Sequence, residues 1–345
     1  MDLFTILEQT ARRYPDCGAV YSGSTRVWTF AELERRALAL SAALTERYES
    51  GDRIAIFSPN CPEYVELLFG TWAAGMSVTP INGKLHPREV AQIVEDATPR
   101  VLFVNPTMAE DVRAALAGLP SDPAVELIEI GSKEYESDLG GTGAVRKFCD
   151  PEQLAWLFFT SGTTGRPKGA MLSHRNLLAM SLAHLADMDD PGPETSLLHA
   201  APMSHGSGLY IPAYLSRGAR QVIPESRGFS PAEILDLCRA HPDCSAFLAP
   251  TMIQRLRREK SRDGRDAGNL RTVIYGGGPM YLREIQESLD VFGDVFVQIY
   301  GLGETPMTIT GLRRPDFVQR DPRVLASVGY PRSGVEVAVA VEVIG

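Results

Sequence analysis

Short runs of apolar residues recur along the chain, and each ends at a break that contains glycine or proline. Such runs are typical of buried strands, whereas apolar positions spaced three and four apart are typical of helices. The predicted strands are Arg53–Phe57, Val101–Val104, Leu154–Phe159, Thr272–Tyr275 and Val295–Tyr300, and the predicted helices are Phe30–Leu44, Ser173–Leu185 and Pro231–Arg239. Strands that alternate with helices predict an α/β fold with mostly parallel sheets and helices on both faces.

Three of these strands end at conspicuous loops, which are Thr160–Gly169, Gly276–Pro279 and Gly301–Glu304. In parallel sheets, ligands bind beyond the carboxyl ends of the strands. Three such loops in one fold therefore predict a single shared cleft.

The two ends of the chain carry patterns of their own. Met1–Glu8 has the spacing of an amphipathic helix and contains acidic residues, which is not the pattern of a signal peptide. Val335–Val339 alternates in the manner of a short strand. The longest apolar stretch, about Val65–Pro80, is shorter than the roughly 20 residues that a membrane span needs. We therefore expect no transmembrane segment and a cytoplasmic protein.

Composition excludes further classes of protein. The chain has 345 residues, of which 44% are hydrophobic and 22% are charged, as in an ordinary globular protein. A formal charge of −9 argues against a nucleic-acid binder, which would need a basic face. The five cysteines are scattered without a CxxC pair, so neither a disulfide framework nor a zinc site is indicated. The sequence leaves the oligomeric state open, a homo-oligomer included.

The loop Thr160–Gly169 carries the strongest chemical signal. All ten of its residues are hydroxyl-bearing, glycine, proline or basic, and they directly follow a predicted buried strand. Glycines allow backbone N–H groups to wrap phosphate oxygens, hydroxyls add donors, and Lys168 adds a mobile positive charge. The alternative is a flexible surface loop. A Walker A loop does not fit, because no Ser or Thr follows Lys168.

These residues resemble the signature loop of the adenylate-forming superfamily, which includes acyl-CoA synthetases, firefly luciferases and the adenylation domains of peptide synthetases. Further stretches resemble family motifs in the same order: Met171–Asn176, a helix start with Ser173 as N-cap; Pro202–Gly208, beside the carboxylate; Gly276–Met280, the adenine turn; Tyr300–Glu304, which stacks on adenine and holds magnesium; and Ser327–Pro331, the start of a small barrel. The resemblance covers essentially the whole chain.

The resemblance implies an architecture. Residues 1–310 would form a large N-terminal domain of two packed α/β subdomains, roughly residues 51–175 in one and residues 1–50 with 176–310 in the other. Residues 311–345 would begin a distorted β-barrel. The family's ribose-binding Asp, its hinge and the catalytic Lys of its C-terminal lid domain would lie beyond Gly345. We therefore expect a chain without the lid domain, whose activity is impaired.

The resemblance also implies a reaction. A fatty or aryl carboxylic acid would attack the α-phosphate of ATP, giving acyl-AMP and pyrophosphate, and the thiol of coenzyme A would then displace AMP. Mg²⁺ would assist, held by Glu304. His205, Glu304 and Lys168 are the expected catalytic groups. The expected nucleotide-binding residues are Thr160, Ser161, Gly162, Thr163, Thr164, Gly165, Lys168, Gly276, Gly277, Gly278, Pro279, Tyr300, Gly301, Gly303, Glu304 and Thr305. The expected acid pocket is lined by His205, Thr251, Gly277, Gly303 and Thr308.

Several alternatives remain at this stage. Gly303 stands where the family usually has Thr or Ser, whose hydroxyl would touch the α-phosphate. This departure and the expected loss of the lid keep a non-catalytic ATP or acyl-adenylate binder in view. A module that loads a carrier protein is also open. Among the relatives that the chain resembles, those that activate amino acids place an Asp near the position of His205 to hold the α-ammonium. Pro202–Gly208 contains no Asp, so the resemblance disfavours amino acids as substrates. His205 and Tyr300 could each be structural, and His174 is expected to be so.

Overall fold

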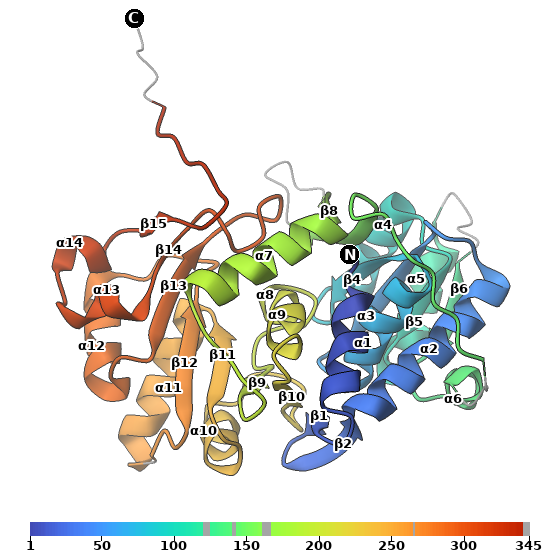
Figure 1. Cartoon of the computed structure of the whole chain (residues 1–345). Coiled ribbons are helices and arrows are strands. Elements are labelled where there is room, and N and C mark those ends of the chain that lie inside the picture. Colours follow the sequence, from blue (N-terminus) through green and yellow to red (C-terminus); the bar gives the residue numbers. More distant parts are fainter. Residues whose placement is uncertain (120–124, 140–142, 161–166, 265, 341–345) are drawn as a thin grey trace, which may run out of the picture.

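The computed structural model describes residues 1–119, 125–139, 143–160, 167–264 and 266–340. Two mostly parallel sheets, one of nine strands and one of six, stand beside each other with helices packed around them (Figure 1). The predicted α/β fold with mostly parallel sheets is confirmed.

The six-stranded sheet is built from one continuous part of the chain. Its order is β6 (Glu126–Glu129), β5 (Val101–Val104), β3 (Arg53–Ser58), β4 (Ser77–Asn82), β7 (Leu154–Thr160) and β8 (Lys168–Ser173), and only the β7–β8 pair is antiparallel. Successive side chains of β3 alternate between two cores, as the period of a strand requires, with Ile54 and Ile56 on one face and Ala55 and Phe57 on the other. The first face is covered by α1 (Phe4–Arg13), α2 (Phe30–Arg47), α3 (Glu63–Ala73) and α6 (Lys133–Leu139), and the second by α4 (Pro87–Ala97), η1 (Pro106–Met108) and α5 (Ala109–Ala117).

The nine-stranded sheet combines distant parts of the chain. Its order is β15 (Tyr330–Pro331), β14 (Thr310–Leu312), β13 (Phe296–Tyr300), β12 (Leu270–Tyr275), β11 (Cys244–Leu248), β9 (Ser196–Leu198), β10 (Arg220–Ile223), β1 (Gly18–Ser22) and β2 (Thr25–Thr29). One face packs on α10 (Pro231–Ala240), α11 (Pro250–Asp263), α12 (Leu282–Phe292), α13 (Arg314–Val318) and α14 (Pro322–Leu325), and the other on α7 (His174–Asp187), α8 (Gly206–Leu209) and α9 (Ile211–Leu215).

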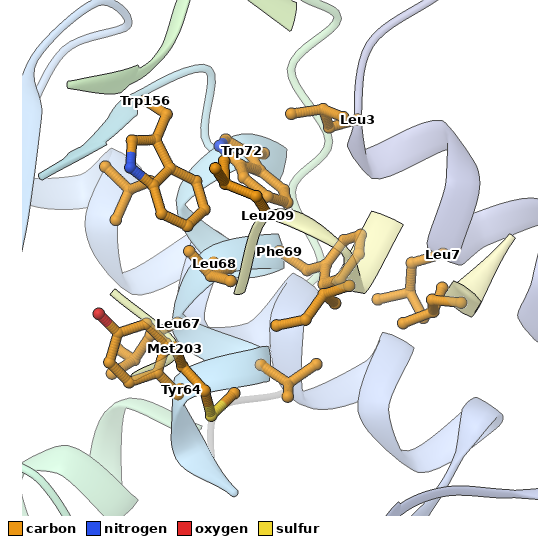
Figure 2. Packing of buried hydrophobic residues seen from close by; sticks show 14 of the residues in the cluster. Leu3, Leu7, Tyr64, Leu67, Leu68, Phe69, Trp72, Trp156, Met203 and Leu209 are labelled. Atoms are coloured by element: carbon orange, nitrogen blue, oxygen red, sulfur yellow. The ribbon is translucent and has the colours of Figure 1, made fainter. Parts of the chain in front are cut away.

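A shared hydrophobic core joins the two sheets (Figure 2). It includes most of α3, whose residues Tyr64 to Ala73 are all buried, because its apolar side chains point in every direction and its one buried carboxylate, Glu66, is paired with Arg36. Trp72 of α3 donates from its indole N–H to the carbonyl oxygen of Ala155 at 2.9 Å. Met203 and Leu209, from beside the nine-stranded sheet, enter the same cluster. The sheets are thus held together by one continuous apolar interior.

Local sequence signals explain where two of the helices begin. Ser173 is the N-cap of α7, as predicted: its hydroxyl accepts from the N–H of Asn176, whose side chain bonds back to Ser173 N–H. Thr29 and Glu32 form the equivalent capping box at the start of α2. Such reciprocal pairs satisfy donors that a helix start leaves without partners.

The strand predicted at Val335–Val339 was wrong. Residues through 340 follow β15 without strand pairing, and Val339 is 90% exposed. A strand needs a partner for its backbone groups, and within the described residues no segment pairs with this one. No closed barrel forms in the part of the chain that the structure describes. The division into domains near residue 310 stays a prediction.

Candidate functional site

The predicted phosphate loop is the tip of an antiparallel hairpin. Thr160 is the last residue of β7 and pairs with Lys168, and Phe159 pairs with Gly169. The prediction that Lys168 and Gly169 belong to the loop was therefore wrong, because the strand ladder continues through them. Ser161, Gly162, Thr163, Thr164 and Gly165 lie outside the described residues. Lys168 itself is exposed.

The loop that follows β13 lies directly against the end of β7. A Cβ atom on Gly303 would lie 2.7 Å from Thr160 Cγ2 and 3.1 Å from Phe158 Cδ1, both shorter than ordinary contacts. Gly301 is equally confined, since a Cβ there would come within 2.6 Å of the backbone nitrogen of Met307. Glycine at position 303 therefore lets this loop touch the strand that precedes the predicted phosphate loop, and glycine at position 301 lets the loop fold back on itself.

A cavity of about 460 Å³ brings two of the predicted motifs together. Its lining includes Gly277, Gly278 and Pro279 from the loop after β12, and Tyr300 and Gly301 from the end of β13. The Tyr300 side chain is accessible, with 42% of the residue exposed. Gly276 does not line this cavity, and a Cβ on Gly276 would collide with Ile299. An aromatic face beside a glycine turn can bind a flat heterocycle.

His205 faces a different cavity, of about 230 Å³, which Thr160 and Pro167 also line. Its ring packs edge-on against Phe158 with centroids 5.2 Å apart, and its Nδ1 lies 2.9 Å from the Ser204 hydroxyl. Burial lowers the pKa of His205. A neutral imidazole that lines a cavity can accept or donate one hydrogen bond.

Glu304, Thr305 and Thr308 line a third cavity, of about 450 Å³, against α7. The Glu304 carboxylate is exposed. Among the described residues, no group of three or more His, Cys, Asp or Glu side chains could hold a metal ion. A single accessible carboxylate near the predicted phosphate loop is the kind of ligand that Mg²⁺ takes, since this ion keeps water and phosphate oxygens as most of its ligands.

The five residues predicted to line the acid pocket do not share one cavity. His205, Gly277 and Thr308 line three different ones, and Gly303 fills the contact with β7. Thr251 is exposed in the first turn of α11 and lines none of the three.

Sequence reasoning missed residues that shape this region. Phe247 of β11 lies between two of the predicted motifs. A Cβ built on Gly206 would lie 2.4 Å from its ring, and a Cβ built on Gly277 would lie 4.0 Å from it. Ser327 and Val328 complete the 460 Å³ cavity. An apolar strand position such as Phe247 carries no signal that separates a site wall from ordinary core.

Comparison with known proteins adds a family and a fold. A family model described as AMP-binding enzyme matches residues 7–342. Feruloyl-CoA synthase of Amycolatopsis sp is 33% identical over 335 residues, which cover 96% of this chain and 64% of that protein. The fatty acid–[acyl-carrier-protein] ligase ScoC of Streptomyces coeruleorubidus is 28% identical over 316 residues, which cover 90% and 60%. The chain thus spans less than two thirds of the length of these relatives.

Solved structures agree on the fold. The inhibitor-bound N-terminal domain of FACL13 from Mycobacterium tuberculosis superimposes with a TM-score of 0.85 at 24% identity, covering 96% of this chain and 82% of that one. ATP-bound MatB from Rhodopseudomonas palustris gives a TM-score of 0.74 at 26% identity, covering 90% and 62%. No helix in the described ranges has both the length and the apolar character needed to cross a bilayer.

Proposed function

Because the chain belongs to the AMP-binding enzyme family, we propose that it activates a carboxylic acid with ATP and transfers the acyl group to the thiol of coenzyme A. A carboxylate oxygen attacks the α-phosphorus of ATP and the bond to pyrophosphate breaks, which gives acyl-AMP. The thiolate then attacks the acyl carbon and AMP leaves.

One observation supports this proposal above the others. The Gly277–Pro279 turn and Tyr300 line one cavity. Tyr300 leads directly into the loop in which Gly303 packs against Thr160. A nucleotide with its base beside Tyr300 would therefore extend its phosphates toward the β7–β8 hairpin. Backbone amides, hydroxyls and Lys168 at that hairpin would neutralise the charge that develops on pyrophosphate as it departs.

Further roles follow within the same proposal. Glu304 would hold Mg²⁺, which supplies positive charge to the phosphates. His205 would guide the acid's carboxylate, because its neutral ring lies on the cavity that Thr160 shares. Thr251 and Thr308 remain proposed contacts of the acid. Cytoplasmic location and self-association likewise stay predictions.

The acid is proposed to be aryl or aliphatic. One relative is named for feruloyl-CoA and others for fatty acids. Transfer to a carrier protein is a second candidate, which the relative named as an acyl-carrier-protein ligase favours. Nucleotide binding without catalysis is a third, because a hydroxyl-bearing side chain does not fit at Gly303.

Acid-dependent exchange of pyrophosphate into ATP tests the proposal. With Mg²⁺ and a panel of aryl, short-chain and long-chain acids, we expect exchange with at least one class. Tyr300→Ala is expected to raise the KM for ATP roughly tenfold, the loss that one base-stacking contact of about 1–3 kcal/mol causes. Tyr330→Ala is the matched control, since Tyr330 is also exposed but lies on β15 outside the 460 Å³ cavity. ATP binding without exchange for any acid would favour the non-catalytic candidate.

A further inference from the structure

Asn60 forms a clamp between the two sheets. It follows β3 of the six-stranded sheet and is 5% exposed. Its amide nitrogen donates to the carbonyl oxygens of His199 at 2.7 Å and Ala201 at 2.9 Å, and its Oδ1 accepts from Met203 N–H at 2.8 Å. All three partners belong to the segment that leaves β9 of the nine-stranded sheet, about 140 residues further along the chain.

The same segment is fixed a second time by His199. Its ring is fully buried, with Nδ1 2.8 Å from the hydroxyl of Ser207 and Nε2 3.1 Å from Oε1 of Gln221. Ser207 lies in α8, a helix that begins directly after His205. Residues 199–207 are therefore held in two ways. The Asn60 side chain bonds the backbone at the start of the segment, and the ring of His199 bonds Ser207 at its end.

His205 depends on both sheets for its position. Its backbone belongs to this segment, where its N–H donates to the carbonyl of Pro202 at 3.1 Å. Its ring, however, packs against Phe158 of β7 in the six-stranded sheet. Asn60, which follows β3 of the same six-stranded sheet, bonds the segment to the side of the molecule that carries β7. A movement of either sheet against the other would separate the ring from Phe158 and from the cavity that Thr160 lines.

We propose that Asn60 is a positioning residue, which clamps residues 199–203 so that His205 faces the cavity beside Thr160. This inference rests on the proposed function, in which His205 guides the acid. Asparagine suits the task because it offers two donors and an acceptor on a short side chain. Aspartate would keep the acceptor for Met203 but lose both donors, and alanine would leave three buried backbone groups without partners.

Asn105 supplies a matched control. It follows β5 of the same sheet and is also buried, at 4% exposure. Its Oδ1 accepts from the N–H of Thr107 at 3.1 Å and from the hydroxyl of Thr107 at 2.7 Å, so these bonds are local and lie away from residues 199–207. Asn105→Ala therefore reports the general cost of losing a buried asparagine.

The first measurement is the titration of His205 by NMR in a histidine-labelled chain, which has six histidines. His205→Gln assigns the resonance. In Asn60→Ala we expect the pKa of His205 to rise toward its ordinary value, because the ring loses burial, while Asn105→Ala leaves it unchanged. Asn60→Asp takes the place of Asn60→Ala if circular dichroism finds the alanine variant unfolded. An unchanged His205 titration in a folded Asn60 variant would overturn the proposal.

The second measurement is pyrophosphate exchange with the acid that the wild-type chain accepts. We expect Asn60→Ala to lower kcat about 10–100-fold, as small misplacements of a reacting group do, with the KM for ATP changed less than about twofold. Equal losses of kcat in Asn60→Ala and Asn105→Ala would show a structural role only and would overturn the proposal. Absence of exchange in the wild-type chain would count against the proposed function alone, since the titration still decides whether Asn60 positions His205.

Discussion

At the scale of the residue, the absence of a Cβ at Gly303 sets how closely two parts of the site approach. In the loop after β13, Gly303 packs directly against the side chains of Thr160 and Phe158 at the end of β7. No space remains there for a side chain on Gly303.

Gly303→Ala tests this packing. The added methyl would lie 2.7 Å from Thr160 Cγ2, and overpacking of this kind typically costs about 1–3 kcal/mol of stability. We expect a lower midpoint in urea and weaker ATP binding by calorimetry. Thr160→Ser removes the opposing methyl and keeps the hydroxyl, so the double variant should recover most of both losses. If the double variant is no better than Gly303→Ala, the contact with Thr160 is not the cause.

At the scale of the element, the contiguous apolar strands were predictable and the pairing at their ends was not. Arg53–Phe57 and Leu154–Phe159 were predicted to within one residue because burial on both faces makes each strand a continuous apolar run. Lys168 and Gly169 are polar or small and were predicted as loop, yet they pair with β7. The five-residue alternation at Val335–Val339 predicted a strand that no partner supports. In both cases pairing with another segment, which a local pattern does not report, decided the outcome.

The short strands β14 and β15 offer an element-scale prediction. Gly329 and Gly334 flank β15 with the same φ of +81°, but a Cβ on Gly329 would lie 2.1 Å from the carbonyl oxygen of Gly311 in β14, whereas a Cβ on Gly334 meets nothing within 4 Å. Gly334→Ala should cost about 1 kcal/mol from its backbone conformation alone. Gly329→Ala should cost at least about 2 kcal/mol more, because a carbonyl oxygen cannot move aside without parting the strands.

Thermal unfolding and ATP titration of the two variants check this expectation. Only Gly329→Ala should also weaken ATP binding, because Ser327 and Val328, just before it, line the cavity that contains Tyr300. Equal effects of the two substitutions on stability and binding would mean that the contact between β14 and β15 does not support the cavity.

At the scale of the whole molecule, the sequence predicted that two motifs are neighbours but not which residues hold the two sheets together. The glycine turn Gly277–Pro279 and Tyr300 were predicted as neighbours and do line one cavity, because motifs at the ends of adjacent parallel strands must meet. The five residues predicted for an acid pocket were not brought into one cavity, because their placement depends on how the two sheets face each other. Asn60 gave no signal, because a polar residue in a loop looks like any solvated one until its partners in the segment after β9 are known.

Buried histidines make the stability of the whole molecule depend on pH. Burial lowers the pKa of His174, His184 and His199 to about 4, from an ordinary value of 6.5. Between these values the unfolded chain binds more protons than the folded chain, so the free energy of unfolding falls as pH falls from 6.5 toward 4. Each histidine contributes at most roughly 3 kcal/mol to this fall.

His184→Leu should make that fall shallower. Neither ring nitrogen of His184 meets a hydrogen-bond partner within the described residues, so leucine should leave stability at pH 7 unchanged or raised. His199→Leu is the contrast, because it leaves the hydroxyl of Ser207 and Oε1 of Gln221 without their partner in His199. It should lower the free energy of unfolding by about 1–3 kcal/mol at pH 7. Urea unfolding at pH 7 and pH 5 measures both. If stability depends on pH as steeply in His184→Leu as in the wild type, His184 does not contribute to the pH dependence.

The pairing of β1 with β10 has a consequence for how the chain matures on the ribosome. Residues 18–29 are synthesised early, yet the strand they join, Arg220–Ile223, emerges about two hundred residues later, which takes roughly 10–40 s at ordinary translation rates. The six-stranded sheet, drawn from residues 53–173, is complete before then and can fold first. During this interval β1 is paired with β2 only, and its other edge has no partner until β10 has been made. We expect a holding chaperone to bind at this unpaired edge.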